Sequence, residues 1–148
     1  MSKLDQFTGT AGKKRLASAL KSHEIIGKNA ALAREVAEQA SVEDFPSGKT
    51  LLEQNATDNH LYMILDGEVA IVVNGKRVAT SGPGAPIGEM AIVDPSGGRS
   101  ASVVAIKDTV VARLTRPRFM ALAKKHPQIW FAIARHLTRH VRAHNKRF

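Results

Sequence analysis

The sequence predicts an α+β fold in which helices at both ends of the chain flank an antiparallel, jelly-roll-like β-roll. Three observations support this prediction. Apolar residues recur at helical intervals up to residue 40 and again after residue 115. Between these stretches, short runs rich in β-branched residues alternate with turn residues. Many short strands joined by tight turns are typical of an antiparallel sandwich or roll and not of a parallel sheet.

Length and composition indicate one domain and exclude several classes of protein. A chain of 148 residues can bury one hydrophobic core. We expect N-terminal helices over 1–40, the roll over 41–114 and C-terminal helices over 115–148. The lack of cysteine excludes disulfides, thiolate metal sites and cysteine nucleophiles. No apolar run reaches the roughly 18 residues of a transmembrane helix, and the polar start does not resemble a signal peptide, so we expect a cytoplasmic protein without a transmembrane segment.

Two helices are predicted before the roll and two after it. Leu16 and Leu20 share one face of the first helix, and Asn29 can cap the second. After the roll, Thr115 can cap a helix that ends at Pro127, where the last helix begins. The apolar stripe of this last helix is expected to contain Trp130, Ile133, Ala134, Leu137 and Val141.

The roll is expected to contain seven short strands. Asp66-Gly67 and Asn74-Gly75 predict two-residue hairpins, because both residues of each pair adopt positive φ at little cost. The predicted strands are 42–45, 50–54, 60–65, 68–73, 76–80, 101–106 and 109–114.

The net charge of +9 is concentrated near the C-terminus. No acidic residue follows Asp108, whereas ten lysines and arginines lie between Arg113 and Arg147. Such a segment attracts nucleic acid, an acidic protein or an anionic membrane surface. A solubilising helix face explains the same pattern equally well.

Residues 87–103 place a carboxylate and a guanidinium on either side of a loop, within otherwise core-like sequence. Burying Glu89 and Arg99 without partners would be costly. Arg99 offers the bidentate fork that suits a phosphate, and a short helix opening at Glu89 would offer free N–H groups. The segment therefore predicts a site for a small anionic ligand that carries a hydroxyl. A mutual salt bridge between the two side chains is the structural alternative.

Residues 88–91 read Gly-Glu-Met-Ala, and residues 99–103 read Arg-Ser-Ala-Ser-Val. This pair of motifs resembles the phosphate-binding cassette of the cyclic nucleotide-binding domain family, which has Gly-Glu-x-Ala, a variable loop and Arg-x-Ala-Ser/Thr-Val. The strand-Gly-strand hairpin at 61–69 is also similar, and the resemblance covers roughly 26–141. The family includes catabolite activator proteins, regulatory subunits of cyclic-AMP-dependent protein kinase and cyclic-nucleotide-gated channels.

The resemblance implies a role for each residue of the cassette. Glu89 would accept the ribose 2′-hydroxyl, and the Gly88 backbone would lie against the sugar. Arg99 would pair with the cyclic phosphate, helped by the N–H groups of Ala91 and Ser100. The expected ligand-binding set is Gly88, Glu89, Met90, Ala91, Arg99, Ser100, Ala101 and Val78.

The side chains that contact the base are harder to predict. Val78 is expected on the purine, together with one side chain of the last helix. Ser100 modestly favours cyclic AMP over cyclic GMP, because family members that prefer cyclic GMP often carry threonine there. The candidates on the last helix are Leu137, Arg139, His140, Val141 and Arg142.

Metal binding and catalysis are not expected. His136, His140 and His144 recur every four residues, a spacing that can chelate a metal. Because no carboxylate or cysteine joins them and arginines crowd the helix, we expect a solvated basic face, with no metal and no cofactor. Ser100 and Ser102 have no histidine base nearby and no acyl-transfer motif. We therefore predict that the protein is not an enzyme.

Together these features predict a non-catalytic sensor of a cyclic nucleotide, with cyclic AMP favoured over cyclic GMP. Ligand binding would move the C-terminal helix and signal to a separate partner protein. The main alternative is a basic adaptor that binds nucleic acid or an acidic protein through 115–148 and has a degenerate pocket. A cyclic-nucleotide phosphodiesterase is remote, because the sequence shows no cluster of metal ligands.

Overall fold

Two four-stranded antiparallel sheets form the roll in the computed structural model, which describes residues 2–146. The first sheet has the order β1-β8-β3-β6, and the second has the order β2-β7-β4-β5. The first sheet comprises β1 (Ser41–Phe45), β8 (Thr109–Leu114), β3 (Leu61–Asp66) and β6 (Pro86–Ile87). The second comprises β2 (Thr50–Leu52), β7 (Ser102–Ala105), β4 (Val69–Val73) and β5 (Lys76–Ser81).

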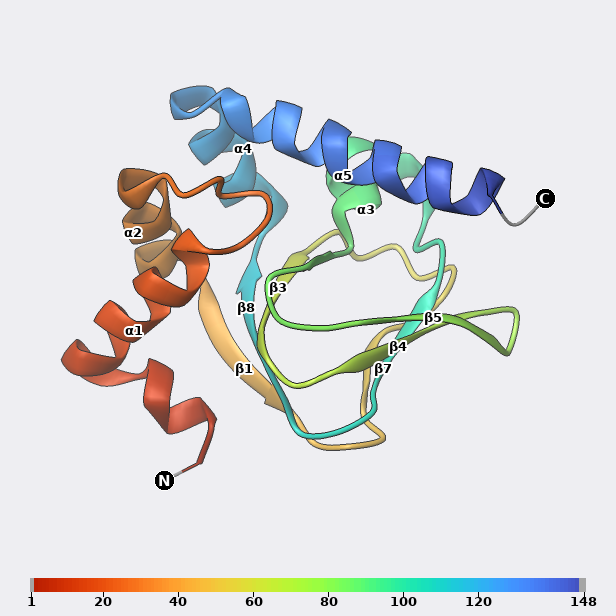
Figure 1. Cartoon of the computed structure of the whole chain (residues 1–148), viewed down its shortest axis with the longest axis horizontal. Helices are drawn as coiled ribbons and strands as arrows, with labels where there is room; N and C mark the ends of the chain where they lie inside the picture. Colours follow the sequence, from red (N-terminus) through yellow and green to blue (C-terminus); the bar gives the residue numbers. More distant parts are fainter. Residues whose placement is uncertain (1, 147–148) are drawn as a thin grey trace.

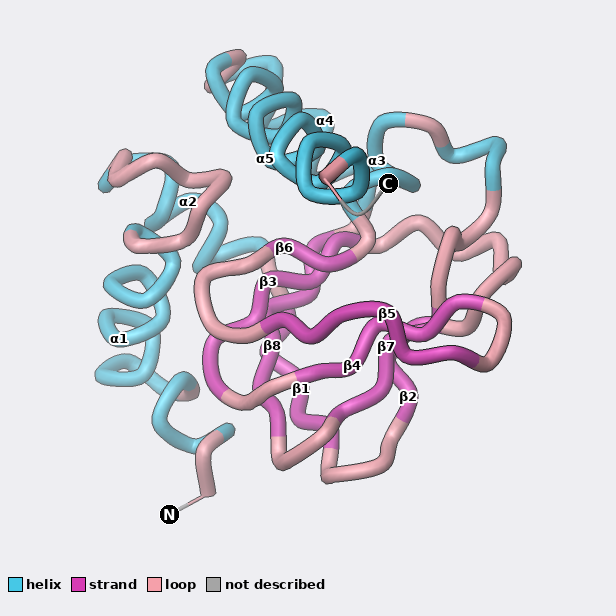
Figure 2. Tube along the Cα trace, turned by 45° about the vertical axis from the view of Figure 1, so that its right-hand side comes forward, coloured by secondary structure: helices cyan, strands magenta, loops and turns pink. Residues whose placement is uncertain are grey.

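Helices from both ends of the chain cover the first sheet and one end of the roll (Figure 1). The last helix runs across the end of the roll above the short helix α3 (Figure 2). Across residues 2–146, each helix is too short or too polar to cross a membrane. The helices are η1 (Leu4–Phe7), α1 (Gly9–Lys21), α2 (Ala30–Gln39), α3 (Glu89–Val93), η2 (Pro95–Gly97), α4 (Arg116–Lys125) and α5 (Gln128–Asn145).

The α+β prediction is confirmed, and one of the two predicted helix caps forms. The side chain of Asn29 caps α2 by accepting a hydrogen bond from the N–H of Leu32 at 3.0 Å. Thr115 precedes α4, but its side chain makes no capping hydrogen bond. Of the ten C-terminal lysines and arginines, Arg147 lies outside the described residues.

The hairpin predicted at Asn74-Gly75 is confirmed, because β4 pairs with β5 across it. The hairpin predicted at Asp66-Gly67 is wrong, because β3 and β4 belong to different sheets and the turn carries the chain from one sheet to the other. Asn74 and Gly75 both have positive φ, at 51° and 77°. At Asp66-Gly67 the positive φ is confined to Gly67, at 106°. Strand β6 was not predicted, because its two residues are too few to show alternation and include a proline.

The molecule has two hydrophobic cores. One lies between the helices and the first sheet, where Leu20, Phe119 and Ile133 are buried together. The other lies between the two sheets and includes Ile64 and Val103. Helix α5 contributes to the first core and also crosses the end of the roll. It therefore connects the helices that cover the first sheet to the segment 87–103, which we call the cassette.

The predicted apolar stripe of the last helix is confirmed at Ile133, which is buried, and at Trp130 and Leu137, which pack against the first core. It is wrong at Ala134 and Val141, which are exposed. The buried residues of α5 are Ile129, Ile133 and His136. Val141 is 58% exposed, and Phe131 on the outer face is 68% exposed. His136 takes the third inward position, which counting apolar residues alone does not predict.

His23, in the turn after α1, is buried, and burial lowers its pKa from 6.5 to about 4. The unfolded chain therefore binds a proton more readily than the folded chain. The resulting stability is complete above the unfolded pKa and is lost as the pH falls from 6.5 toward 4. We expect a loss of about 2 kcal/mol between about pH 7 and about pH 5.

Urea unfolding at the two pH values measures this loss. His23→Gln removes the titrating group, so its free energy of unfolding should change less between the same pH values. An equal loss in both proteins would contradict the assignment to His23.

Candidate functional site

A cavity of about 440 Å³ lies between β4, β5 and β7 of the roll, the segment 87–103 and helix α5. The structure places all eight predicted site residues around this cavity. Apolar side chains of the roll and histidines of α5 complete the lining. Among them are Leu52, Ile71, Val103, His136, His140 and His144.

The segment 87–103 folds as a turn, a short helix and a loop. Gly88 has φ of 86° and precedes α3, whose first residue is Glu89. A Cβ at position 88 would lie 2.5 Å from an Arg99 guanidinium nitrogen and 3.0 Å from the carbonyl oxygen of His60. Glycine is therefore needed for both the backbone angle and the space. The close approach brings the two ends of the segment together.

Arg99 is 3% exposed and is fixed by three acceptors. Its Nη2 donates to the Asp58 carboxylate at 2.8 Å and to the carbonyl oxygen of His60 at 2.7 Å. Its Nη1 donates to the carbonyl oxygen of Gly88 at 3.2 Å. Burial favours a higher pKa for Asp58, but the guanidinium outweighs it and lowers this pKa. The guanidinium is thus held in one orientation at the cavity wall.

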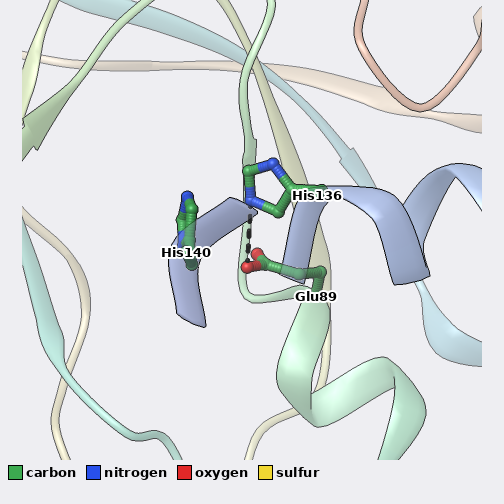
Figure 3. A group of neighbouring side chains, drawn as sticks. All are labelled: Glu89, His136 and His140. Atoms are coloured by element: carbon green, nitrogen blue, oxygen red, sulfur yellow. Dashed lines mark ion pairs between the residues drawn. The ribbon is translucent and has the colours of Figure 1, made fainter. Parts of the chain in front are cut away.

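Glu89 is also buried, and it faces α5 (Figure 3). Its Oε1 lies 3.3 Å from Nε2 of His136, and Nδ1 of His136 lies 3.0 Å from Oε1 of Glu24. Arg139 donates to the same Glu24 oxygen at 2.6 Å. Burial alone would lower the pKa of His136, but Glu89 and Glu24 together raise it, which favours the imidazolium between two carboxylates.

These contacts show what sequence reasoning missed. Arg99 pairs with Asp58 and Glu89 pairs with His136, so the suggested Glu89–Arg99 salt bridge is not the arrangement found. The expected solvated face is wrong for His136, which is 4% exposed, although His140 is exposed. The four-residue spacing of the histidines was the one sequence signal that pointed to a site on α5. It could not indicate that the fold brings Glu24 and Glu89 to His136.

Comparison with known proteins identifies the family of this site. Residues 42–126 match the family profile described as the cyclic nucleotide-binding domain. The chain belongs to this family. It is accordingly a cyclic nucleotide-binding regulatory domain.

Three relatives illustrate the likeness. The Pycsar effector protein BcPycTIR of Burkholderia cepacia is 35% identical over 143 residues, which cover 97% of this chain and 47% of that protein. The cyclic AMP receptor protein of Thermus thermophilus is 34% identical over 103 residues, 66% of this chain and 47% of that protein. The crystal structure of Thermus thermophilus catabolite activator protein has a TM-score of 0.70 and 29% identity, and the match covers 79% of this chain and 57% of that one. This chain therefore spans about half the length of the curated relatives it matches.

Within this cyclic nucleotide-binding domain, α5 forms one wall of the cavity. Of the five α5 side chains considered for the base, His140 is the one that lines the cavity among the described residues. On the opposite side, Val78 of β5 is partly exposed to the cavity. The hydroxyl of Ser100 lies 3.5 Å from the sulfur of Met90. The cavity thus has an apolar wall, a buried guanidinium and a buried carboxylate.

Proposed function

We propose that this domain binds cyclic AMP in the cavity between the roll and α5 and acts as a non-catalytic sensor. The observation that carries the proposal is the convergence of buried Arg99 and buried Glu89 on one cavity. A guanidinium binds a phosphate, whereas a carboxylate accepts from a hydroxyl and repels a phosphate. A cyclic phosphate joined to a ribose presents both a phosphate and a hydroxyl.

Two observations favour cyclic AMP among the cyclic nucleotides. Ser100 and the name of the Thermus thermophilus cyclic AMP receptor protein favour it. The apolar side chains of Leu52, Ile71 and Val78 can pack on any base. The identity of the base is therefore the part of the proposal that most needs a direct test.

The contact between Glu89 and His136 supports signalling through α5. A ribose hydroxyl that hydrogen-bonds Glu89 must share or displace His136, which α5 carries. Binding would then weaken one of the ion pairs that hold α5 over the cassette. A ligand that favours one of two helix positions shifts the population between them. The partner that reads this position is proposed to be an effector, as the name BcPycTIR of the relative suggests.

The basic adaptor remains the second candidate, but the charges of the domain disfavour it. Several C-terminal cations are engaged within the molecule, including Arg113 with Glu43, Arg116 with the carbonyl oxygen of Ile92, and Arg139 with Glu24. A cytoplasmic location belongs to the proposal as well, and its support is the lack of cysteine. DNA binding that falls steeply with salt and ignores cyclic nucleotide would favour the adaptor.

Titration calorimetry with cyclic AMP, cyclic GMP, cyclic CMP and cyclic UMP tests the proposed function. We expect saturable binding, tightest for cyclic AMP. Glu89→Gln should weaken it by about tenfold or more, because a hydrogen bond to a charged group contributes about 1.5 to 3 kcal/mol. Glu53→Gln, at an exposed position outside the cavity, is the control and should bind normally.

The outcomes separate the two parts of the proposal. Tightest binding of another cyclic nucleotide would overturn cyclic AMP and keep the sensor. No binding of any of the four would overturn the sensor itself.

A further inference from the structure

Three potential metal ligands meet where α5 crosses the cassette (Figure 3). They are Glu89 at the start of α3 and two histidines, His136 and His140, one turn apart on α5. One ligand atom from each lies within 4.8 Å of the others. The sequence places no carboxylate near these histidines in the chain. The fold does, because Glu89 lies beside them.

The distances suit a small tetrahedral ion. Zinc binds histidine nitrogen and carboxylate oxygen at about 2.0 to 2.1 Å, so two ligands of a tetrahedral site lie about 3.3 Å apart. Nε2 of His136 and Oε1 of Glu89 are separated by 3.3 Å. His140 is exposed, and its ring centroid lies 4.2 Å from that of His136. One of its ring nitrogens already lies within 4.8 Å of the ligand atoms of Glu89 and His136.

A second carboxylate holds His136 in the orientation that metal binding requires. Nδ1 of His136 donates toward Glu24 at 3.0 Å, which leaves Nε2 directed at Glu89. Histidine ligands of zinc usually donate their other ring N–H to a carboxylate in this way. Arg139 in turn fixes Glu24. Glu89 of α3 and the two histidines of α5 thus form the metal-binding group, and Glu24 of the α1–α2 turn and Arg139 of α5 orient one of its ligands.

We propose that Glu89, His136 and His140 bind a zinc ion that clamps α5 onto the cassette. Two nitrogens and one carboxylate oxygen suit Zn²⁺, whereas Mg²⁺ and Ca²⁺ prefer oxygen ligands. The ion takes the place of the proton on Nε2 of His136, which leaves to water, and the fourth position takes a water molecule. Because Glu89 is shared, zinc competes with the cyclic nucleotide; this consequence alone rests on the proposed function.

Cobalt(II) is the spectroscopic probe for this site, since it substitutes for zinc and absorbs visible light. Untagged protein titrated with Co²⁺ alone should show the visible bands of a tetrahedral ion, saturating at one ion per chain and removed by Zn²⁺. His140→Ala should weaken binding by more than about tenfold, the lower end of what loss of even an outer partner costs. Because His140 is exposed, this variant should fold normally.

His126→Gln is the matched control. His126 also contacts a carboxylate, with Nε2 3.1 Å from Oε2 of Glu35, but it lies outside the cavity. Its variant should bind Co²⁺ as the unaltered chain does. Absence of saturable Co²⁺ binding, or unchanged binding by His140→Ala, would overturn the zinc site.

No nucleotide is used in the cobalt titration, so its failure leaves the sensor proposal standing. If Co²⁺ binds, adding the cyclic nucleotide found by calorimetry should bleach the bands. Persistent bands at saturating nucleotide would overturn the competition.

Discussion

Arg99→Ala is expected to weaken cyclic nucleotide binding by at least about 100-fold. Four of the five guanidinium N–H groups already donate to Asp58 and to the carbonyl oxygens of His60 and Gly88. A phosphate that receives the fifth N–H and takes the place of the Asp58 carboxylate would accept at least two charge-assisted hydrogen bonds, each contributing about 1.5 to 3 kcal/mol, and about 1.4 kcal/mol corresponds to a factor of ten. The contacts to the two carbonyl oxygens hold the fork in place before binding. Little ordering of Arg99 is then needed when the ligand arrives.

The same contacts mean that Arg99→Ala also removes a structural support. The variant leaves the Asp58 carboxylate and two partly buried carbonyl oxygens without their donor, so its stability should fall. Arg99→Lys separates the two effects, because lysine keeps the charge but loses the planar fork. We expect its affinity to lie between those of the unaltered chain and Arg99→Ala.

Calorimetry should be paired with denaturant unfolding for each variant. Arg77→Ala, on the exposed β4–β5 hairpin, is the control for a lost positive charge and should bind normally. A folded Arg99→Ala protein with unchanged affinity would show that the phosphate lies elsewhere.

The sequence predicted the features whose signals are local. Each of the two motifs, Gly-Glu-x-Ala and Arg-x-Ala-Ser-Val, is a continuous run of residues. In the structure they meet where Gly88 lies against the Arg99 guanidinium. The strands followed from alternation and from turn pairs such as Asn74-Gly75. These signals depend on residues within a few positions of one another, where backbone preferences dominate. The treatment of 1–148 as a single domain stays a prediction.

The partners of the charged residues could not be predicted. Asp58 is 41 residues from Arg99 in sequence, and Glu24 lies on the α1–α2 turn, far from His136 of α5. Only tertiary packing brings these side chains together. The inward position of His136 was missed for a related reason, because two carboxylates from other elements contact its ring.

Gly67→Ala is expected to destabilise the fold by about 3 kcal/mol or more, combining the cost of positive φ with that of overpacking. Gly67 has φ of 106° in the β3–β4 connection. An added Cβ would lie 2.6 Å from the carbonyl oxygen of Asp108 and 2.6 Å from Cα of Thr109, and it would also meet the Thr109 hydroxyl. Both obstacles involve backbone, so no side-chain rotation can relieve them.

The clash cannot be avoided by moving Thr109. This residue is fully buried, and its hydroxyl contacts the carbonyl oxygens of Lys107 at 2.8 Å and Glu68 at 3.2 Å. It also accepts from the N–H of Glu68 at 3.3 Å, which ties β8 to the β3–β4 connection. Displacing Thr109 would break the hydrogen bonds that join the two sheets at this corner.

Gly75→Ala is the control that separates the cost of the steric clash from the cost of positive φ. Gly75 also has positive φ, at 77°, but a Cβ there would meet nothing within 4 Å. We therefore expect this variant to lose only about 1 to 2 kcal/mol. Urea unfolding of the two variants measures the difference, and equal losses would show that φ alone decides the cost. A larger loss at Gly67 would mean that this glycine is required because another strand passes beside it, which the turn signal in the sequence cannot indicate.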